Sequence, residues 1–221
     1  DGVMSRGLGD VYKRQAKDSI ENEVAPSKHA LFYTAHLLCL AGLSGILLTG
    51  DAFNLFVFLE VSSLATYTLV SLASDRRCLV AAFRYLMMGT IGATFILIGV
   101  GMLYMKTGTL NMLDLASRID LYDSSRTINS GLAFIMVGVS IKLALFPLHM
   151  WLPPAYTHAP SAVSAFLAGT ATKVAVYVMI RFIFTVFGVN HVFEEMGMDL
   201  ILMALALVAI FKGSYMATVQ S

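Results

Sequence analysis

Four prolines interrupt an apolar stretch between two lysines in residues 142–173, which read KLALFPLHMWLPPAYTHAPSAVSAFLAGTATK. Proline lacks a backbone N–H and fixes φ, so it breaks the hydrogen-bond ladder of a helix. A helix that enters this stretch is therefore predicted to end or break around residues 146–154, at Pro147, Pro153 and Pro154. Backbone freed at membrane depth is tolerated only where protein or a wet cavity surrounds it. Broken helices of this kind are typical of ion sites in transporters.

The rest of the chain is strongly apolar. Hydrophobic residues make up 57% and charged residues 13% of its 221 residues, whereas a typical soluble domain carries about 25% charged residues. About 20 apolar residues in a helix cross the hydrocarbon core of a bilayer. Stretches of about that length occupy residues 30–49, 52–73, 80–105, 130–148, 161–187 and 200–216. We therefore expect an all-α, polytopic transmembrane helix bundle of about six spans, with a proline-broken helix, in a lipid bilayer.

Charge and cysteine usage exclude several other classes of protein. The formal net charge of +1 offers no basic field for nucleic acid. Cys39 and Cys78 fit no metal-binding spacing, and we interpret them as small apolar residues. No phosphate loop, dinucleotide motif, haem motif or nucleophile triad is present. We therefore predict no resident cofactor or metal and no catalytic chemistry within this chain.

The N-terminal segment differs from the spans that follow it. Ten charged residues lie within the first 28 positions, and residues 1–15, DGVMSRGLGDVYKRQ, have no apolar face. They resemble translated sequencing-adapter sequence, so we predict a non-native-looking or disordered segment at 1–29, unpacked at 1–15, and a transmembrane domain at 30–221. Because the sixth span is followed by only a few residues, we expect a fragment of a longer membrane protein.

Three ionisable side chains lie well inside the predicted spans. They are Glu60 in the second span, Lys142 in the fourth and Lys173 in the fifth. An ionisable residue at the centre of a membrane helix costs about 2.5–3.5 kcal/mol on insertion scales, so such residues commonly pair and serve ion or proton pathways. We interpret the three as a proton relay in which Glu60 and Lys142 pair across helices and Lys173 points toward the proline-broken segment. The alternative is a structural ion pair that only fixes packing.

Two histidines lie within or beside the proline-rich stretch. His149 and His158 titrate in the physiological range, and we consider them possible members of the relay. The competing interpretation places them at the membrane interface with satisfied hydrogen bonds. A second alternative is an intramembrane enzyme that holds a metal with both histidines, although their nine-residue spacing fits no common ligand pattern.

The basic residues give a weak indication of orientation. Arg76, Arg77 and Arg84 flank the link at 74–79, and short loops rich in Lys and Arg tend to stay in the cytoplasm. This indicates a cytoplasmic location for residues 74–79.

Two stretches resemble a known family. They are AFNLFVFLEVSSLATY at 52–67 and IKLALFPLHMWLPPAYTHAPSAVSAFLAGTATKVAVYVMIRF at 141–182. Both are similar to the antiporter-like membrane subunits shared by respiratory complex I, membrane-bound hydrogenases and Mrp-type cation/proton antiporters. Members have about fourteen helices, and the resemblance, which covers about residues 28–221, implies that this chain matches the fourth to the ninth.

The resemblance also implies a site. In the family, a glutamate on the fifth helix pairs with a lysine on the broken seventh helix, which couples to a lysine on the eighth. These positions match Glu60, Lys142 and Lys173. Complex I members usually carry an acidic residue and a histidine after the WLP motif, where Pro154 and Tyr156 stand here.

This departure favours the D-type polypeptide of Mrp antiporters. The implied function is a proton-translocating subunit of a multisubunit cation/proton antiporter in the cell inner (plasma) membrane. Its partners would be the other subunits, protons, and Na⁺ or K⁺. The alternative is a proton-pumping subunit of an NADH:quinone oxidoreductase or a membrane-bound hydrogenase.

Overall fold

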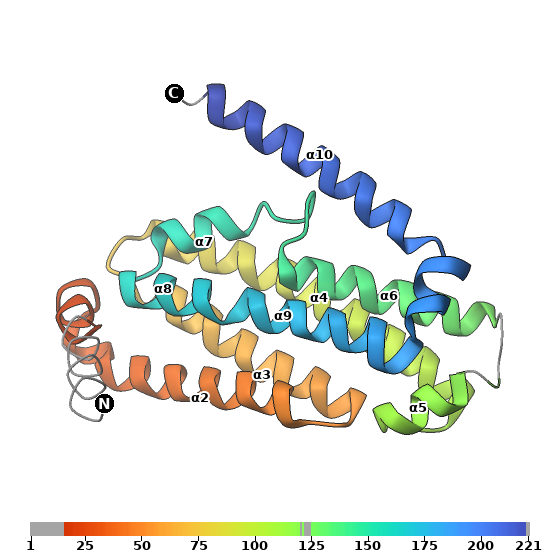
Figure 1. The fold of residues 1–221 in the computed structure, drawn as a ribbon. Coiled ribbons are helices and arrows are strands. Elements are labelled where there is room, and N and C mark those ends of the chain that lie inside the picture. The colour runs from red at the N-terminus through yellow and green to blue at the C-terminus, as the bar shows by residue number, and fades with distance from the viewer. Residues whose placement is uncertain (1–15, 120, 122–124, 220–221) are drawn as a thin grey trace, which may run out of the picture.

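The fold of the described residues is helical, as the composition predicts. The computed structural model describes residues 16–119, 121 and 125–219. The elements are η1 (Pro26–Lys28), α2 (His29–Leu48), α3 (Ala52–Ser71), α4 (Arg77–Thr107), α5 (Met112–Ile119), α6 (Arg126–Leu143), α7 (Leu152–His158), α8 (Ser161–Gly169), α9 (Ala171–Ile180), η3 (Arg181–Phe187), η4 (His191–Glu195) and α10 (Met198–Val219). Here η1 is a 3₁₀-helix, and η3 and η4 are π-helical. Figure 1 shows the long helices lying side by side.

Within the described residues, five helical segments are long and apolar enough to cross a membrane. They are Pro26–Leu48, Ala52–Ser71, Arg77–Thr107, Ser161–Phe187 and Met198–Val219. The expected span at 130–148 is not among them. Its helix, α6, has 18 residues and ends at Leu143, because the backbone turns before Pro147. The expectation of six spans is therefore corrected to five by length and composition, with α6 as a shorter helix packed inside the bundle.

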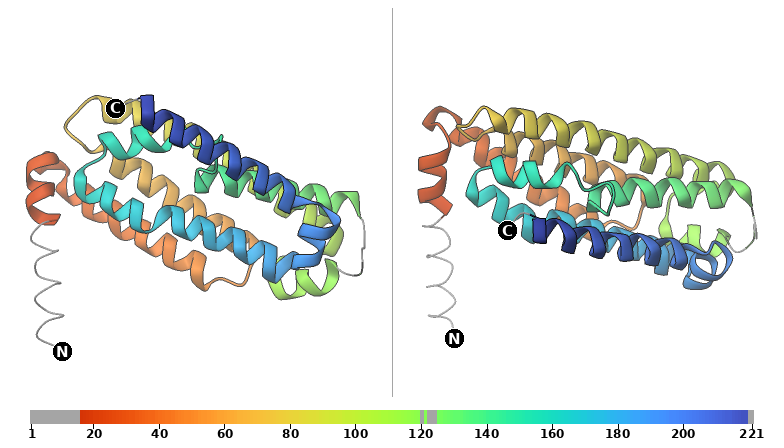
Figure 2. Two further views of the ribbon diagram at one scale, coloured as in Figure 1. Left: turned by 45° about the horizontal axis from the view of Figure 1, so that its top comes forward. Right: turned by 90° about the horizontal axis from the view of Figure 1, so that it is seen from above.

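The helices α2, α3, α4, α6 and α9 form a ring, which we call the helix ring. Consecutive members contact one another in the order α2, α3, α4, α6 and α9, and α9 closes the ring by contacting α2. The two views in Figure 2 show this arrangement from different sides. The centre of the ring is consequently the place where side chains from distant parts of the sequence meet.

Glycines allow α4 and α6 to pack backbone against backbone. A Cβ added at Gly138 would lie 2.5 Å from the carbonyl oxygen of Gly92, and one at Gly99 would lie 2.6 Å from that of Gly131. Each pair is separated by seven residues along its helix, so both contacts lie on one face of each antiparallel helix. Small residues at such positions let membrane helices approach closely, which fixes the register of α6 and of Lys142 on it.

The break predicted at the prolines is confirmed. Helix α6 ends at Leu143, and Ala144 takes a left-handed conformation with φ of 59°. The chain then turns until α7 begins at Leu152. The indole Nε1 of Trp151 donates a hydrogen bond to the carbonyl oxygen of Ile141 at 3.0 Å, which satisfies an acceptor near the helix end where α-helical donors run out.

A second break divides the fifth predicted span. Helix α8 ends at Gly169 and α9 begins at Ala171, with Thr170 between them at φ of −123° and ψ of −59°. The span then continues as the π-helical segment η3. The sequence predicts one continuous apolar helix here, and the structure corrects this: the span is interrupted three residues before Lys173.

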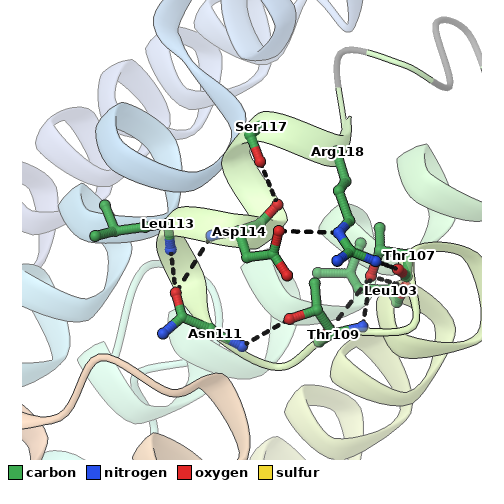
Figure 3. A network of polar contacts seen from close by, with 8 residues as sticks. All are labelled: Leu103, Thr107, Thr109, Asn111, Leu113, Asp114, Ser117 and Arg118. Atoms are coloured by element: carbon green, nitrogen blue, oxygen red, sulfur yellow. Dashed lines mark hydrogen bonds and ion pairs between the residues drawn. The ribbon is translucent and has the colours of Figure 1, made fainter.

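The periphery of the bundle carries short polar elements and α10. In Figure 3, Asn111 caps α5 by accepting hydrogen bonds from the backbone N–H groups of Leu113 and Asp114. Arg118 pairs with Asp114 at 2.9 Å and also donates to the carbonyl oxygen of Thr107, near the end of α4. Helix α10 leaves the bundle, and none of its described residues is buried.

The described part of the N-terminal segment is packed. Residues 16–23 are helical, and Ile20 and Val24 are buried with 4% and 2% of their surface exposed. Val24 also forms an isolated β-bridge with Ala73. Residues 16–28 therefore differ from the disordered segment expected at 1–29, because their apolar side chains contact the bundle. The prediction for residues 1–15 lies outside the described residues, and the division of the chain at residue 29 stays a prediction.

Candidate ion-translocation site

An ion pair joins the middle of α3 to the end of α6. The ammonium Nζ of Lys142 donates to Oε1 of Glu60 at 2.9 Å and to the hydroxyl of Ser63 at 2.7 Å. The Lys142 side chain is 7% exposed and that of Glu60 is 26% exposed. Both charges face the bundle, as expected, because an unpaired charge in a low-dielectric interior is costly. Ser63 lies one helical turn from Glu60, so α3 presents both acceptors on one face.

A small cavity adjoins this ion pair at the centre of the helix ring. It has a volume of about 30 Å³, and residues of every ring helix line it: Leu43, Ile46, Leu59, Ser62, Ser63, Thr66, Tyr85, Lys142, Ala171, Val174 and Ala175. Hydroxyl groups and the Lys142 ammonium provide several hydrogen-bonding partners. A space of this size and polarity suits a water molecule, so the site has room for a proton carrier next to Lys142.

A column of aromatic rings connects the ion pair with the helix break. Tyr67 packs edge-on against Tyr85 at 4.6 Å between ring centroids, and Tyr85 stacks on Trp151 at 4.1 Å. Trp151 in turn donates to Ile141, the residue before Lys142. The Tyr67 ring lies where a side chain on Gly89 would be, since a Cβ there would be 1.7 Å from the Tyr67 hydroxyl. These rings hold the end of α6, and therefore Lys142, in position.

Lys173 lies in a separate groove on the outer side of α9. Its ammonium donates to the carbonyl oxygen of Ala168 and to the Thr172 hydroxyl, and its side chain is exposed. The groove has a volume of about 360 Å³ and is lined by α2 and by the α8–α9 break: Leu40, Leu43, Ser44, Leu47, Gly169, Thr170, Lys173, Val174 and Tyr177. The expected direction, toward the proline-broken segment, is therefore wrong. The break at Thr170 frees carbonyl groups at the end of α8, and the ammonium turns to one of them.

The cavity at Lys142 and the groove at Lys173 share a wall. Leu43 of α2 and Val174 of α9 line both spaces. Leu43 is buried, with 7% of its surface exposed. Two apolar side chains thus separate a buried lysine beside a water-sized cavity from an exposed lysine in an open groove. We call Leu43 and Val174 the apolar wall.

The two histidines lie outside this cavity and this groove. His149 stacks on Phe146 at 5.4 Å between centroids, and its buried Nδ1 has no hydrogen-bond partner among the described residues. Nδ1 of His158 lies 4.0 Å from Oδ2 of Asp75, at the link between α3 and α4. The relay role expected for the histidines therefore stays a prediction, and neither histidine lies between Lys142 and Lys173.

A metal-dependent enzyme finds no ligand cluster in the described part of the chain. No group of three or more His, Cys, Asp or Glu side chains there is placed to hold a metal ion. His149 and His158 occupy different surroundings, as described above, so they do not form the paired site that this alternative requires.

Sequence reasoning missed several residues of the site. It did not indicate the aromatic column, the break at Thr170 or the apolar wall. The single tryptophan of the chain, placed just after a predicted helix end, was the available signal for Trp151. Leu43 and Val174 carry no such signal, because leucine and valine are common throughout the spans.

Comparison with known proteins identifies the family. A model of the family described as NADH:quinone oxidoreductase/Mrp antiporter, transmembrane, matches residues 49–221. The chain belongs to this family. It is a multi-pass membrane protein, which agrees with its apolar helices, and the inner membrane agrees with its bacterial relatives.

Individual relatives come from several kinds of complex. The N-type polypeptide of the NADH-quinone oxidoreductase of Desulforudis audaxviator is 50% identical over 161 residues, which are 73% of this chain and 32% of that protein. The D-type polypeptide of the Na(+)/H(+) antiporter of Alkalihalophilus pseudofirmus is 37% identical over 160 residues, or 72% of this chain and 32% of that protein. The membrane-bound sulfane sulfur reductase, an archaeal respiratory membrane complex, contains a chain with 36% identity and a TM-score of 0.66, covering 72% of this chain and 32% of that one.

These matches bear on the choice between parent complexes. This chain spans about a third of the length of the curated relatives that it matches. The identity to the oxidoreductase polypeptide is higher than that to the antiporter polypeptide, so the Pro154 and Tyr156 pattern alone does not decide for an Mrp-type complex.

Proposed function

We propose that this chain is part of a proton-translocating subunit of a multisubunit membrane complex and that Glu60, Lys142 and Lys173 form its relay. The observation that carries the proposal is the bond of the Lys142 ammonium to Glu60 and Ser63, beside a cavity of about 30 Å³ inside the helix ring. A buried lysine with a single carboxylate partner can exchange its proton when that partner moves away, because its pKa depends strongly on its surroundings.

The ion pair acts as the gate of the relay. While Glu60 holds Lys142, the ammonium is stabilised and keeps its proton. When the pair opens, the proton can leave Lys142 through a water molecule in the cavity. The shortest exit toward a second titratable group crosses the apolar wall to Lys173. Leu43 and Val174 line both spaces, so a small displacement of either side chain joins them.

Lys173 serves as the acceptor on the other side of the wall. Its contact with the Ala168 carbonyl oxygen holds the ammonium at the break between α8 and α9. A carbonyl can stabilise the charged form without competing for the proton, so Lys173 can accept a proton and release it again. The groove around Lys173 is open, which gives this lysine access to further groups of the complete protein.

The transported ions and the partners follow from the relatives. One relative is named as part of a Na(+)/H(+) antiporter and another as part of a probable K(+)/H(+) antiporter. We therefore propose other membrane subunits as partners and Na⁺ or K⁺ as the ion exchanged for protons. The higher identity to a polypeptide of an NADH-quinone oxidoreductase supports a second candidate, a respiratory proton pump in which redox chemistry elsewhere drives the same relay.

Lysine substitutions in the intact complex test the relay. Lys142→Met and Lys173→Met should each lower the rate of proton-coupled ΔpH dissipation in membrane vesicles at least tenfold, because methionine cannot carry a proton. Lys173→Arg should also impair transport, since guanidinium stays charged across the working pH range. Lys106→Met, an exposed lysine in the last turn of α4, is the matched control and should stay within twofold of wild type.

Assembly must be measured in the same membranes. Removing a charge from a span removes an insertion cost, so the amount of assembled complex should remain near the wild-type level. Wild-type transport in Lys173→Met would end the relay role of this residue. Lost transport together with lost assembly in both methionine variants would indicate a structural ion pair instead.

A further inference from the structure

A basic groove lies between the start of α4 and α7, away from the relay. It has a volume of about 220 Å³ and is lined by Arg77, Val80, Ala81, Arg84, Pro154 and His158. Three of these side chains are basic, and the other three are apolar. Neither the proton relay nor the helix break makes use of the arginines, so their position calls for a separate explanation.

The two guanidinium groups are free to bind an anion. Within the residues that the structure describes, neither Arg77 nor Arg84 forms a salt bridge, and both side chains are exposed. The nearby carboxylate, Asp75, is engaged elsewhere. Its Oδ1 accepts the backbone N–H of Arg77 at 2.9 Å, and its Oδ2 lies 4.0 Å from Nδ1 of His158.

The helix geometry brings the two arginines together. They are seven residues apart on α4, so they lie on the same face about two turns, or roughly 10 Å, apart along the axis. The Cα–Cβ bonds of a helix tilt toward its N-terminus, and the long side chain of Arg84 can extend in that direction toward Arg77. His158, at the end of α7, borders the same groove from the opposite side.

The surface beside the groove is apolar and belongs to a membrane span. Val80 and Phe83 are 54% and 60% exposed and lie in the first turns of the span Arg77–Thr107. Arg84 thus stands about two turns into a helix that is otherwise suited to hydrocarbon. A charged head above an apolar helix face is the pattern that an amphiphile with an anionic head would match.

We propose that this groove binds the phosphate diester headgroup of an anionic phospholipid, with the acyl chains lying along the exposed apolar face of α4. Guanidinium groups bind phosphate oxygens in a bidentate, charge-assisted manner, and basic pockets between membrane helices on the cytoplasmic side bind anionic headgroups. The basic link at 74–79 is predicted to be cytoplasmic, where anionic lipids are abundant. A free phosphate ion would leave the apolar half of the groove unused, and an acidic protein segment would not need the apolar face of α4.

Lipid titration of the purified chain tests this site. The chain, in nanodiscs of phosphatidylcholine, is titrated with a fluorescent phosphatidylglycerol and separately with the matching phosphatidylcholine probe. Wild type should bind the anionic probe at least tenfold more tightly than the zwitterionic one. Arg84→Gln and Arg77→Gln should each weaken binding of the anionic probe at least fivefold. Arg76→Gln is the matched control, because Arg76 is an exposed neighbour in the same link that does not line the groove.

Each possible result either supports or overturns the proposal. Equal affinity for the two probes, or unchanged binding in Arg84→Gln, would overturn it. An equal loss in Arg76→Gln would indicate attraction by general surface charge and would also overturn it. Displacement of the anionic probe by 10 mM inorganic phosphate would identify a free-anion site instead of a lipid site. Arg84→Lys keeps the charge but loses the bidentate geometry, so intermediate binding in this variant supports the proposal independently of any folding defect in Arg84→Gln.

Discussion

Replacing Gly138 with alanine should separate α4 from α6 and lower the stability of the bundle. The new Cβ would lie 2.5 Å from the carbonyl oxygen of Gly92 and 2.7 Å from Cγ1 of Ile96. Ordinary van der Waals contact begins near 3.4 Å, so the helices must move apart by the difference, 3.4 − 2.5, or about 0.9 Å. A gap of this size forfeits a quarter to a half of the contact energy along the seam.

The expected loss follows from two opposing effects. Overpacking of a well-packed interior costs about 1–3 kcal/mol. Alanine regains up to about 1 kcal/mol over glycine in a helix interior. We therefore expect Gly138→Ala to lower the free energy of unfolding by about 1–2 kcal/mol. Because Lys142 lies one turn further along α6, the same displacement should lengthen its contact with Glu60 and slow transport as well.

The assay is equilibrium unfolding in mixed micelles, followed by the fluorescence of Trp151, the single tryptophan of the chain. Gly101→Ala is the matched control on α4, since nothing lies within 4 Å of a Cβ added there. This variant should be unchanged or slightly stabilised. Equal stability of Gly138→Ala and Gly101→Ala would refute the argument that backbone contact at the glycines sets the register of α6.

Two further predictions concern the N-terminal segment and the apolar wall. Burial raises the pKa of Glu23, but hydrogen bonds from the Ser161 side chain, the Ser161 backbone N–H and Ser19 outweigh it, so that the pKa lies below its ordinary value. Glu23 therefore stabilises the fold above the pKa of the unfolded chain and loses this effect as pH falls through the folded pKa; Glu23→Gln should be less stable than wild type at pH 7, with the difference disappearing below about pH 4 in thermal unfolding scans. A constant difference across that range would contradict it. Leu43→Ala should join the Lys142 cavity to the Lys173 groove and speed proton leak in vesicles at least threefold, whereas an unchanged leak from a stably assembled variant would argue against the apolar wall.

Local sequence patterns were sufficient for the helices and for the interruption near the prolines. Apolar stretches of membrane length predicted the spans, and Pro147, Pro153 and Pro154 predicted the end of α6, because a missing N–H donor acts within one turn. The approach of Glu60 to Lys142 was also predictable. Their charges have opposite sign, and neither can be left alone inside a span at acceptable cost.

The remaining features depend on contacts between residues far apart in the sequence. The closing of the helix ring by α9 against α2, the glycine register of α4 on α6 and the wall shared by Leu43 and Val174 all arise from the packing of separate helices. The direction of Lys173 depends on the break at Thr170, which has no proline to mark it. The sequence determined which residues are too polar to face lipid without a partner. Only the tertiary structure decided which partner each one finds, because that depends on how closely neighbouring helix surfaces fit.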